Sequence, residues 1–191
     1  EGIYSLFETS RIEHVFCYPQ AFHTFGLTLG YLSSVLYGWE LHTPRGKYSR
    51  ASHEERLALR EENLLTLGTP THFFDLLQLV PGRRGIAPSY SCIAGGASVS
   101  RDMWIAMRDE LKIEAPSIGY GCTEAAPGIT HLAPGTEPKT DGEIGAALSS
   151  IRTRISAEGV EISGPALCGA IVQNGRIEFP KKVMVSDRIH T

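Results

Sequence analysis

The chain has 191 residues, which is enough for one sizeable hydrophobic core or two small lobes. Apolar residues make up 42% of it, charged residues 20%, and the formal net charge is -3. This balance argues against nucleic acid or an anionic membrane surface as a partner. No apolar run approaches the roughly 20 residues of a membrane span. The four cysteines lie far apart, which argues against a disulfide framework and predicts a reducing cytoplasm.

The first part of the chain carries strand and helix signals in turn. Residues 16–18 form a short apolar run, and residues 25–37 are apolar enough for a buried helix. Ser52 and Glu55 have the spacing of a capping box, which predicts that a helix begins there. Leucines follow this box at helical spacing, and a glycine and a proline then end the predicted helix: Leu57, Leu64, Leu65, Gly68 and Pro70.

The next elements repeat the order of strand, glycine turn and helix. Residues 71–78 predict a short helix, and residues 91–97 predict a strand that runs into a glycine turn. Ser100 is placed to cap a further helix, and a strand is expected around residues 117–118. This order is typical of an α/β fold with parallel strands. The helix after Ser100 has apolar residues every four positions: Met103, Met107 and Leu111.

Beyond residue 126 helical periodicity disappears and turn residues become dense. Residues 151–156 alternate apolar and polar side chains, as a half-buried strand does. Asn174-Gly175 lies between two strand-like runs and favours a tight hairpin turn. We therefore predict a partial doubly wound α/β lobe at residues 1–130, followed by a small antiparallel β lobe at residues 131–191.

Residues 119–124 carry the strongest chemical signal. Gly119 and Gly121 would let the backbone approach a ligand at the carboxyl edge of a parallel sheet. Thr123 and Glu124 supply a hydroxyl and a hard anionic oxygen, which suit a phosphate and its Mg²⁺, and Tyr120 supplies a flat face for a base. Spacing alone leaves open a plain strand and loop with a solvated Thr-Glu pair.

Tyr120 to Glu124 closely resembles a signature of the adenylate-forming, or AMP-binding, superfamily. This superfamily includes acyl- and aryl-CoA synthetases, luciferases and the adenylation domains of peptide synthetases. Further segments resemble other motifs of this superfamily in the correct order, and together they cover almost the whole chain: residues 19–27, 67–71, 94–100, 142–145, 161–165 and 185–187.

The resemblance implies roles for individual residues. Thr123 would bind the adenylate phosphate, Glu124 would hold Mg²⁺ between the ATP phosphates, and Tyr120 would stack on adenine. Asp187 would accept hydrogen bonds from both ribose hydroxyls, although Val185 and Ser186 replace the usual threonine and glycine before it, and His23 would lie near the substrate carboxylate. The remaining nucleotide-binding positions are small residues, of which the first three would separate the nucleotide from the acyl pocket: Gly95, Gly96, Ala97 and Gly121.

The reaction implied is attack of a carboxylate oxygen on the α-phosphorus of ATP, which gives acyl-AMP and pyrophosphate. A thiol of coenzyme A or of a carrier protein would then accept the acyl group. His23 stands where amino-acid-activating relatives place an aspartate for the substrate ammonium. The resemblance thus favours an acyl or aryl carboxylic acid over an α-amino acid.

The same resemblance implies parts outside this sequence. The family's glycine-rich phosphate loop would precede Glu1, and its hinge and lysine-bearing domain would follow Thr191. We therefore expect that the isolated chain does not form acyl-adenylate at a useful rate. Sheet edges left open by strands outside the sequence would favour self-association, so a homo-oligomer is a possible state.

Other interpretations remain open at this point. The chain could be a binding or scaffold module without catalysis, or an unrelated nucleotide-binding protein such as a dehydrogenase, although the third glycine of that fingerprint is missing. His23 standing alone would be read as a core histidine, and Cys122 as a packing residue. The other six histidines show no metal-ligand spacing along the chain, which predicts surface or core roles for them.

Overall fold

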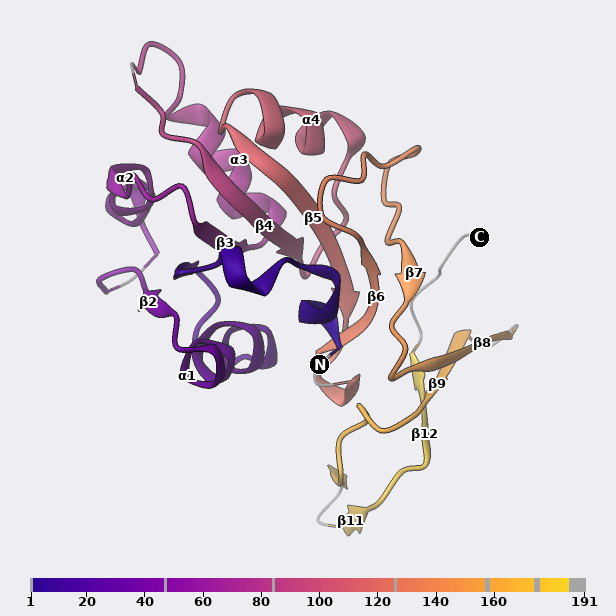
Figure 1. Cartoon of the computed structure of the whole chain (residues 1–191). Coiled ribbons are helices and arrows are strands. Elements are labelled where there is room, and N and C mark those ends of the chain that lie inside the picture. The colour runs from indigo at the N-terminus through magenta and orange to yellow at the C-terminus, as the bar shows by residue number, and fades with distance from the viewer. Residues whose placement is uncertain are drawn as a thin grey trace.

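The computed structural model describes residues 2–46, 48–83, 85–125, 127–156, 159–173 and 176–185. A seven-stranded sheet forms its centre (Figure 1), and five of the strands are parallel. The last two strands each run antiparallel to the neighbour before them. This arrangement confirms the predicted α/β class with parallel strands. In spatial order the strands are β2 (Glu40–His42), β1 (His14–Cys17), β3 (Leu64–Gly68), β4 (Ser89–Gly95), β5 (Ile113–Gly121), β6 (Gly128–Leu132) and β7 (Ala146–Ala147).

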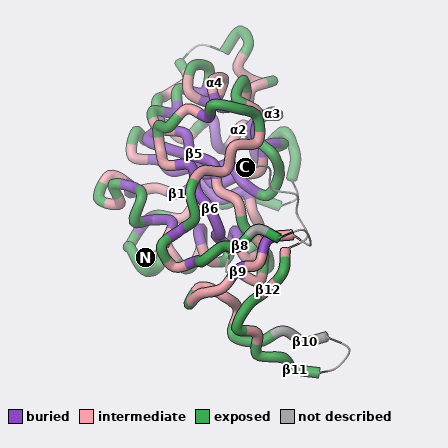
Figure 2. Tube along the Cα trace, turned by 90° about the vertical axis from the view of Figure 1, so that its right-hand side faces the viewer, coloured by how far each residue is buried: buried purple, intermediate pink, exposed green. Residues whose placement is uncertain are grey.

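Both faces of this sheet are covered, so the core is divided into two clusters. Figure 2 shows the buried residues in the interior, around β5 and β6. Neighbouring residues of a strand point to opposite faces: Leu64 belongs to one cluster and Leu65 to the other. Helices α2 (Arg50–Ala58), α3 (Pro70–Gln78) and α4 (Arg101–Asp109) contribute to the first cluster. The second cluster includes residues of the short helix η1 (Ile3–Leu6) and of η3 (Phe25–Leu32). The short helix η2 (Thr9–Arg11) contributes no buried residue, and α1 (Ser33–Tyr37) meets the cluster through the ring contact of Tyr37 with Tyr4.

Helix α4 begins where its sequence predicts. The hydroxyl of Ser100 accepts a hydrogen bond from the backbone N–H of Met103 at 3.2 Å, which satisfies one of the free donors of the first turn. Trp104 and Met107 are buried against the sheet, and the indole Nε1 of Trp104 donates to the carbonyl oxygen of Pro116 at 3.1 Å. The helix is therefore tied to β5, the strand that carries the 119–124 motif.

The predicted start and extent of the helix after Ser52 are wrong. Ser49 is the N-cap of α2, and Ser52 is the third helical residue and the partner of Ser49 in the capping box. The helix ends at Ala58, whereas Leu64 and Leu65 lie in the fully buried strand β3. A strand buried on both faces is apolar at most of its positions, so a few of its leucines can mimic helical spacing.

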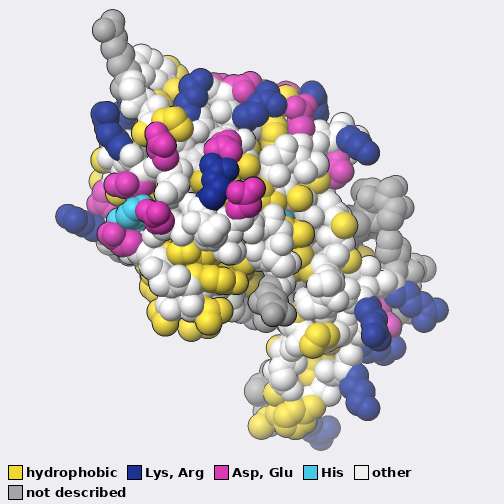
Figure 3. All heavy atoms as spheres, viewed as in Figure 1, with side chains coloured by type: hydrophobic (Ala, Val, Ile, Leu, Met, Phe, Trp, Pro, Cys, Tyr) yellow, Lys and Arg dark blue, Asp and Glu magenta, His cyan; other side chains and the backbone are white. Residues whose placement is uncertain are grey.

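Residues 25–37 are helical as predicted, but the helix is buried on one side only. It begins as the π-helix η3 and continues as α1. Phe25 and Leu29 face the sheet, whereas Leu32, Val35 and Leu36 have exposed fractions of 56%, 84% and 74%. Figure 3 shows apolar side chains gathered on this part of the surface. The high apolar content of this segment therefore did not reveal that only one side of the helix is buried.

The last part of the described chain forms two small antiparallel sheets. One contains β8 (Arg152–Ser156), β9 (Gly159–Ser163) and β12 (Lys182–Val185), and the other contains β10 (Ile171–Gln173) and β11 (Arg176–Glu178). The pairing of β10 with β11 confirms the predicted hairpin, whose turn residues lie outside the described ranges. Strands β6 and β7 join the large sheet, and the division of the chain at residue 130 stays a prediction.

All four cysteines are free, as their spacing predicted. Among the helices of the described ranges, none is long and apolar enough to cross a lipid bilayer.

Candidate functional site

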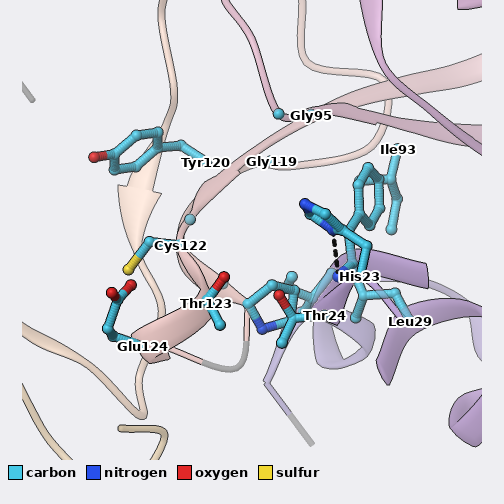
Figure 4. A pocket seen from close by; sticks show the side chains of 16 residues that line it. His23, Thr24, Leu29, Ile93, Gly95, Gly119, Tyr120, Cys122, Thr123 and Glu124 are labelled. Carbon is cyan, nitrogen blue, oxygen red and sulfur yellow. Dashed lines mark hydrogen bonds between the residues drawn. The ribbon is translucent and has the colours of Figure 1, made fainter. Parts of the chain in front are cut away.

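A pocket of about 290 Å³ lies where β4 and β5 end, at the carboxyl edge of the parallel strands. Ligands of open α/β sheets bind at this edge. Figure 4 shows the pocket around the backbone of Gly119, with Cys122 and Glu124 on one side and His23, Leu29 and Ile93 on the other. Its lining comprises Ile3, His23, Thr24, Phe25, Leu29, Ile93, Gly95, Gly96, Gly119, Tyr120, Gly121, Cys122, Thr123, Glu124, Pro127 and Gly128.

Glycine backbone forms the centre of this pocket. Gly95 of β4 pairs with Gly119 of β5, and a Cβ on Gly95 would lie 2.8 Å from the carbonyl oxygen of Gly119. Gly96 has a φ of +83°, a conformation that favours glycine. A Cβ on Gly121 would lie 1.5 Å from the carbonyl oxygen of Pro127. Larger residues at Gly95 and Gly121 would force the backbone apart, and a larger residue at Gly96 would strain it, so the glycines fix the shape of the pocket.

The polar side of the pocket comes from the turn after β5. Thr123 and Glu124 begin the short helix η4 (Thr123–Ala125), in which Thr123 is exposed and Glu124 half-buried. The carbonyl oxygen of Glu124 accepts a hydrogen bond from the backbone N–H of Cys168 at 2.7 Å, which holds the turn against the smaller lobe. A hydroxyl and a carboxylate together are donors that fit Mg²⁺ and phosphate.

The thiol of Cys122 is not set up as a nucleophile. Burial and a hydrogen bond with Glu124 raise the pKa of Cys122 to about 11, so the thiol stays protonated at neutral pH. Its half-buried side chain packs near Ile129 and Ile162 beside the small sheet, which supports the packing role expected from the sequence.

The opposite side of the pocket is apolar. Ile3, Phe25, Leu29 and Ile93 line it, and His23 stands exposed beside them. The backbone N–H of Phe25 donates to Nδ1 of His23 at 3.2 Å, so a neutral ring carries its proton on Nε2. The exposed position rules out the interpretation of His23 as a core histidine.

The pocket brings most of the predicted site residues together, and their individual roles stay predictions. Tyr120 lines the pocket and packs against the cluster beneath the small sheet. Ala97 is exposed and does not line the pocket, and Asp187 lies outside the described residues. The predicted residues found in the lining are His23, Gly95, Gly96, Tyr120, Gly121, Thr123 and Glu124.

Sequence reasoning assigned no site role to the apolar lining. Leu29 follows Phe25 by four residues, and this spacing could have placed both on one face of the predicted helix. Ile93 precedes Gly95 by two residues, so strand periodicity could have placed it on the same face. Ile3 has no comparable signal, because only the fold brings it to the pocket.

A buried histidine lies directly behind the pocket. His131 of β6 pairs with Gly119, and its Nδ1 lies 3.2 Å from where a Cβ on Gly119 would stand. The residue is 3% exposed, and neither ring nitrogen has a hydrogen-bond partner among the described residues. Burial lowers the pKa of His131 to about 4, because the charged form would lose its hydration.

Acid should therefore destabilise the fold through His131. In the native state His131 stays neutral down to a lower pH than in the unfolded state, so its contribution to the free energy of unfolding is fully present above the unfolded-state pKa of about 6.5. Below that value the unfolded chain binds a proton that the native chain does not, which costs up to about 1.4 kcal/mol per pH unit until about pH 4. We expect His131→Leu to flatten the fall in unfolding free energy between these pH values, measured by urea denaturation. An unchanged slope would contradict this account.

Comparison with known proteins links the pocket to a family. The family model described as "AMP-binding enzyme" matches residues 3–176. Acyl-CoA ligase sidI of Aspergillus fumigatus is 31% identical over 118 residues, which cover 58% of this chain and 19% of that protein. Acyl-CoA ligase cnsG of Penicillium expansum is 32% identical over 114 residues, which cover 59% of this chain and 23% of that protein. The match thus spans about a fifth of the length of these relatives.

Solved structures share the fold. A benzoate CoA ligase from Burkholderia xenovorans LB400 superposes with a TM-score of 0.70 at 17% identity, over 82% of this chain and 34% of that one. An O-succinylbenzoate coenzyme A synthetase from Bacillus subtilis, in complex with ATP and a magnesium ion, superposes with a TM-score of 0.66 at 19% identity. That match covers 84% of this chain and 34% of the synthetase.

Proposed function

Because the chain belongs to the AMP-binding enzyme family, we propose that it forms part of an ATP-dependent ligase that activates a carboxylic acid as acyl-AMP. The observation that carries this proposal is the composition of the pocket. Glycine backbone lies between a polar turn with Thr123 and Glu124 and an apolar side with Leu29 and Ile93. An acyl-adenylate has the same two halves, a charged phosphate and an acyl or aryl group, joined at one reacting centre.

The chemistry requires two anions to meet, so charge neutralisation and positioning carry the rate gain. A carboxylate oxygen attacks the α-phosphorus of ATP, and pyrophosphate leaves. The hydroxyl of Thr123 would donate to an oxygen of the α-phosphate, and the carboxylate of Glu124 would hold Mg²⁺. Of the described residues that line the pocket, Glu124 is the one carboxylate, and no lysine or arginine lies among them. Mg²⁺ would therefore supply the positive charge that the phosphates need.

The apolar side supports an acid with an uncharged tail. Phe25, Leu29 and Ile93 offer hydrocarbon surface and no carboxylate that could bind a substrate ammonium. His23 stands at the position from which amino-acid-activating relatives present an aspartate. We therefore propose an acyl or aryl acid as substrate and coenzyme A as acceptor, since the curated relatives are acyl-CoA ligases.

The first test measures binding of a non-hydrolysable acyl-adenylate analogue to the chain by calorimetry. Thr123→Val keeps the shape of the side chain and removes the hydroxyl, so it should weaken binding by about 10- to 100-fold, as expected for a hydrogen bond to a charged group. Thr71→Val changes an exposed threonine of α3 outside the pocket and should leave the affinity unchanged. Equal affinities of the two variants would refute the placement of the phosphate at Thr123.

A second measurement separates catalysis from binding alone. In the complete polypeptide, Glu124→Gln should lower acid-dependent ATP–pyrophosphate exchange by about 100-fold, because it replaces the anionic ligand proposed for Mg²⁺ by a neutral amide. The isolated chain should bind the analogue without catalysing this exchange. Binding without exchange in the complete polypeptide as well would favour a scaffold module over a ligase.

A further inference from the structure

A cluster of metal-binding side chains lies at the other end of the sheet. His14 begins β1, and Glu40 and His42 lie on the edge strand β2. The parallel register pairs His14 with Glu40 and Phe16 with His42. Glu40 and His42 are two residues apart, so strand periodicity places them on one face. His14 and Glu40 are the first residues of β1 and β2, so the cluster lies toward the amino ends of these strands, whereas the pocket lies at the carboxyl ends of β4 and β5.

The separations of the donor atoms match those around a tetrahedral metal ion. Nδ1 of His14 lies 3.3 Å from Nε2 of His42. Oε2 of Glu40 lies 3.6 Å from Nδ1 of His14, and Oε1 of the same carboxylate lies 3.6 Å from Nε2 of His42. Zinc binds imidazole nitrogen and carboxylate oxygen at about 2.0–2.2 Å, and tetrahedral geometry then sets roughly 3.3–3.6 Å between ligand atoms. One ion thus fits among the three side chains with little movement.

A further carboxylate lies behind the cluster. Oε2 of Glu61 is 3.7 Å from Nε2 of His14, on the ring nitrogen that faces away from His42. Zinc-binding histidines commonly donate their second N–H to a carboxylate, which fixes the ring and makes it a better ligand. Glu61 is close to the position needed for this contact.

The surroundings favour a bound ion at the surface. The side chains of His14 and His42 are 20% and 23% exposed, whereas Glu40 is 66% exposed, so the histidines are held and one side of the cluster is open to solvent. Figure 3 shows histidine and acidic side chains together at this edge of the molecule. Two imidazoles and one carboxylate suit Zn²⁺, because Mg²⁺ and Ca²⁺ prefer ligand sets made only of oxygen.

We propose that His14, His42 and Glu40 bind one Zn²⁺ ion, and that Glu61 orients His14. The ion would join the edge strand β2 to β1 through side chains, in addition to the backbone pairing of the two strands. Because the cluster lies away from the pocket, we assign the ion a structural role and not a role in the reaction. From their spacing in the sequence, His14 and His42 were expected to have surface or core roles. This proposal replaces that expectation, because parallel pairing of β1 with β2 brings together two histidines that are 28 positions apart.

The experiment is equilibrium dialysis of the chelator-treated chain against Zn²⁺, with metal content and affinity as readouts. One ion per chain should bind. His14→Ala and His42→Ala should each weaken binding by at least about 100-fold, and Glu61→Gln by about 10-fold, as expected for a carboxylate that orients a ligand. His23→Ala removes an exposed histidine elsewhere and should leave binding unchanged.

Two further measurements keep the proposal testable if a histidine variant unfolds. Glu40→Gln changes an exposed side chain and should also weaken zinc binding by at least about 10-fold, with an unchanged circular dichroism spectrum. Co²⁺ in place of Zn²⁺ should give a spectrum without thiolate-to-metal charge transfer, because the site contains no cysteine. The proposal fails if zinc does not bind, if Glu40→Gln binds as tightly as the unaltered chain, or if the cobalt spectrum shows thiolate ligation.

Discussion

Replacing Trp104 by alanine should lower the free energy of unfolding by about 3–5 kcal/mol, the usual cost of removing a large buried aromatic side chain. Trp104 is 1% exposed and lies in the cluster with Phe73 and Met107. The substitution also removes the hydrogen bond from its Nε1 to the carbonyl oxygen of Pro116. Urea or guanidinium denaturation followed by circular dichroism measures the change.

Two variants separate the causes of this loss. Trp104→Phe keeps most of the apolar contact but removes one of two hydrogen bonds that the carbonyl of Pro116 accepts, the other coming from the backbone N–H of Gly135, so it should cost about 0.5–1.5 kcal/mol. Leu36→Ala truncates a side chain that is 74% exposed and should change stability by less than about 0.5 kcal/mol. If Trp104→Ala cost no more than Leu36→Ala, the described packing of α4 on the sheet would be wrong.

Gly121→Ala should have the largest effect on the pocket. The added Cβ would lie 1.5 Å from the carbonyl oxygen of Pro127, and rotation of a side chain cannot relieve a contact between backbone atoms. The turn that carries Thr123 and Glu124 must therefore move. If the displaced turn loses the hydrogen bond from Thr123 to the charged phosphate, binding of the acyl-adenylate analogue should weaken by at least about 10-fold.

Gly169→Ala provides the matched control for this substitution. A Cβ on Gly169 would meet no atom within 4 Å, so the same chemical change should leave affinity and stability nearly unaltered. If Gly121→Ala bound the analogue as tightly as Gly169→Ala, the pocket could not be the binding site. Thermal unfolding of both variants distinguishes a local shift from loss of the fold.

The elements that sequence predicted best are those with their own local signals. The cap at Ser100 and the Asn174-Gly175 pair specify a helix start and a hairpin through nearby backbone geometry, so the structure agrees at α4 and at β10 and β11. Leu64 and Leu65 carry no such signal. Their environment is decided by helices on both faces of the sheet, which a short apolar run does not reveal.

The same distinction applies to the two sites. The 119–124 motif is contiguous, so its glycines, threonine and glutamate could be identified from spacing and resemblance. Ile3 lies more than 100 residues before this motif, and only the fold brings it to the pocket. His14 meets His42 only because β1 and β2 are neighbours in the sheet. Contacts of this kind depend on strand order, which local sequence patterns do not specify.

The pairing of Gly95 with Gly119 has a consequence for how substrate preference can change. Where these two glycines pair, a bound ligand would contact backbone peptide groups and not side chains. The positions of these groups depend little on which side chains surround them. The side chains of Phe25 and Leu29 come from η3 and that of Ile93 from β4, so each can be exchanged while the peptide groups of Gly95 and Gly119 stay the same. In a ligase of the proposed kind, the part that holds the nucleotide could stay constant while the acid pocket diversifies, which makes these three positions the natural targets for redesign.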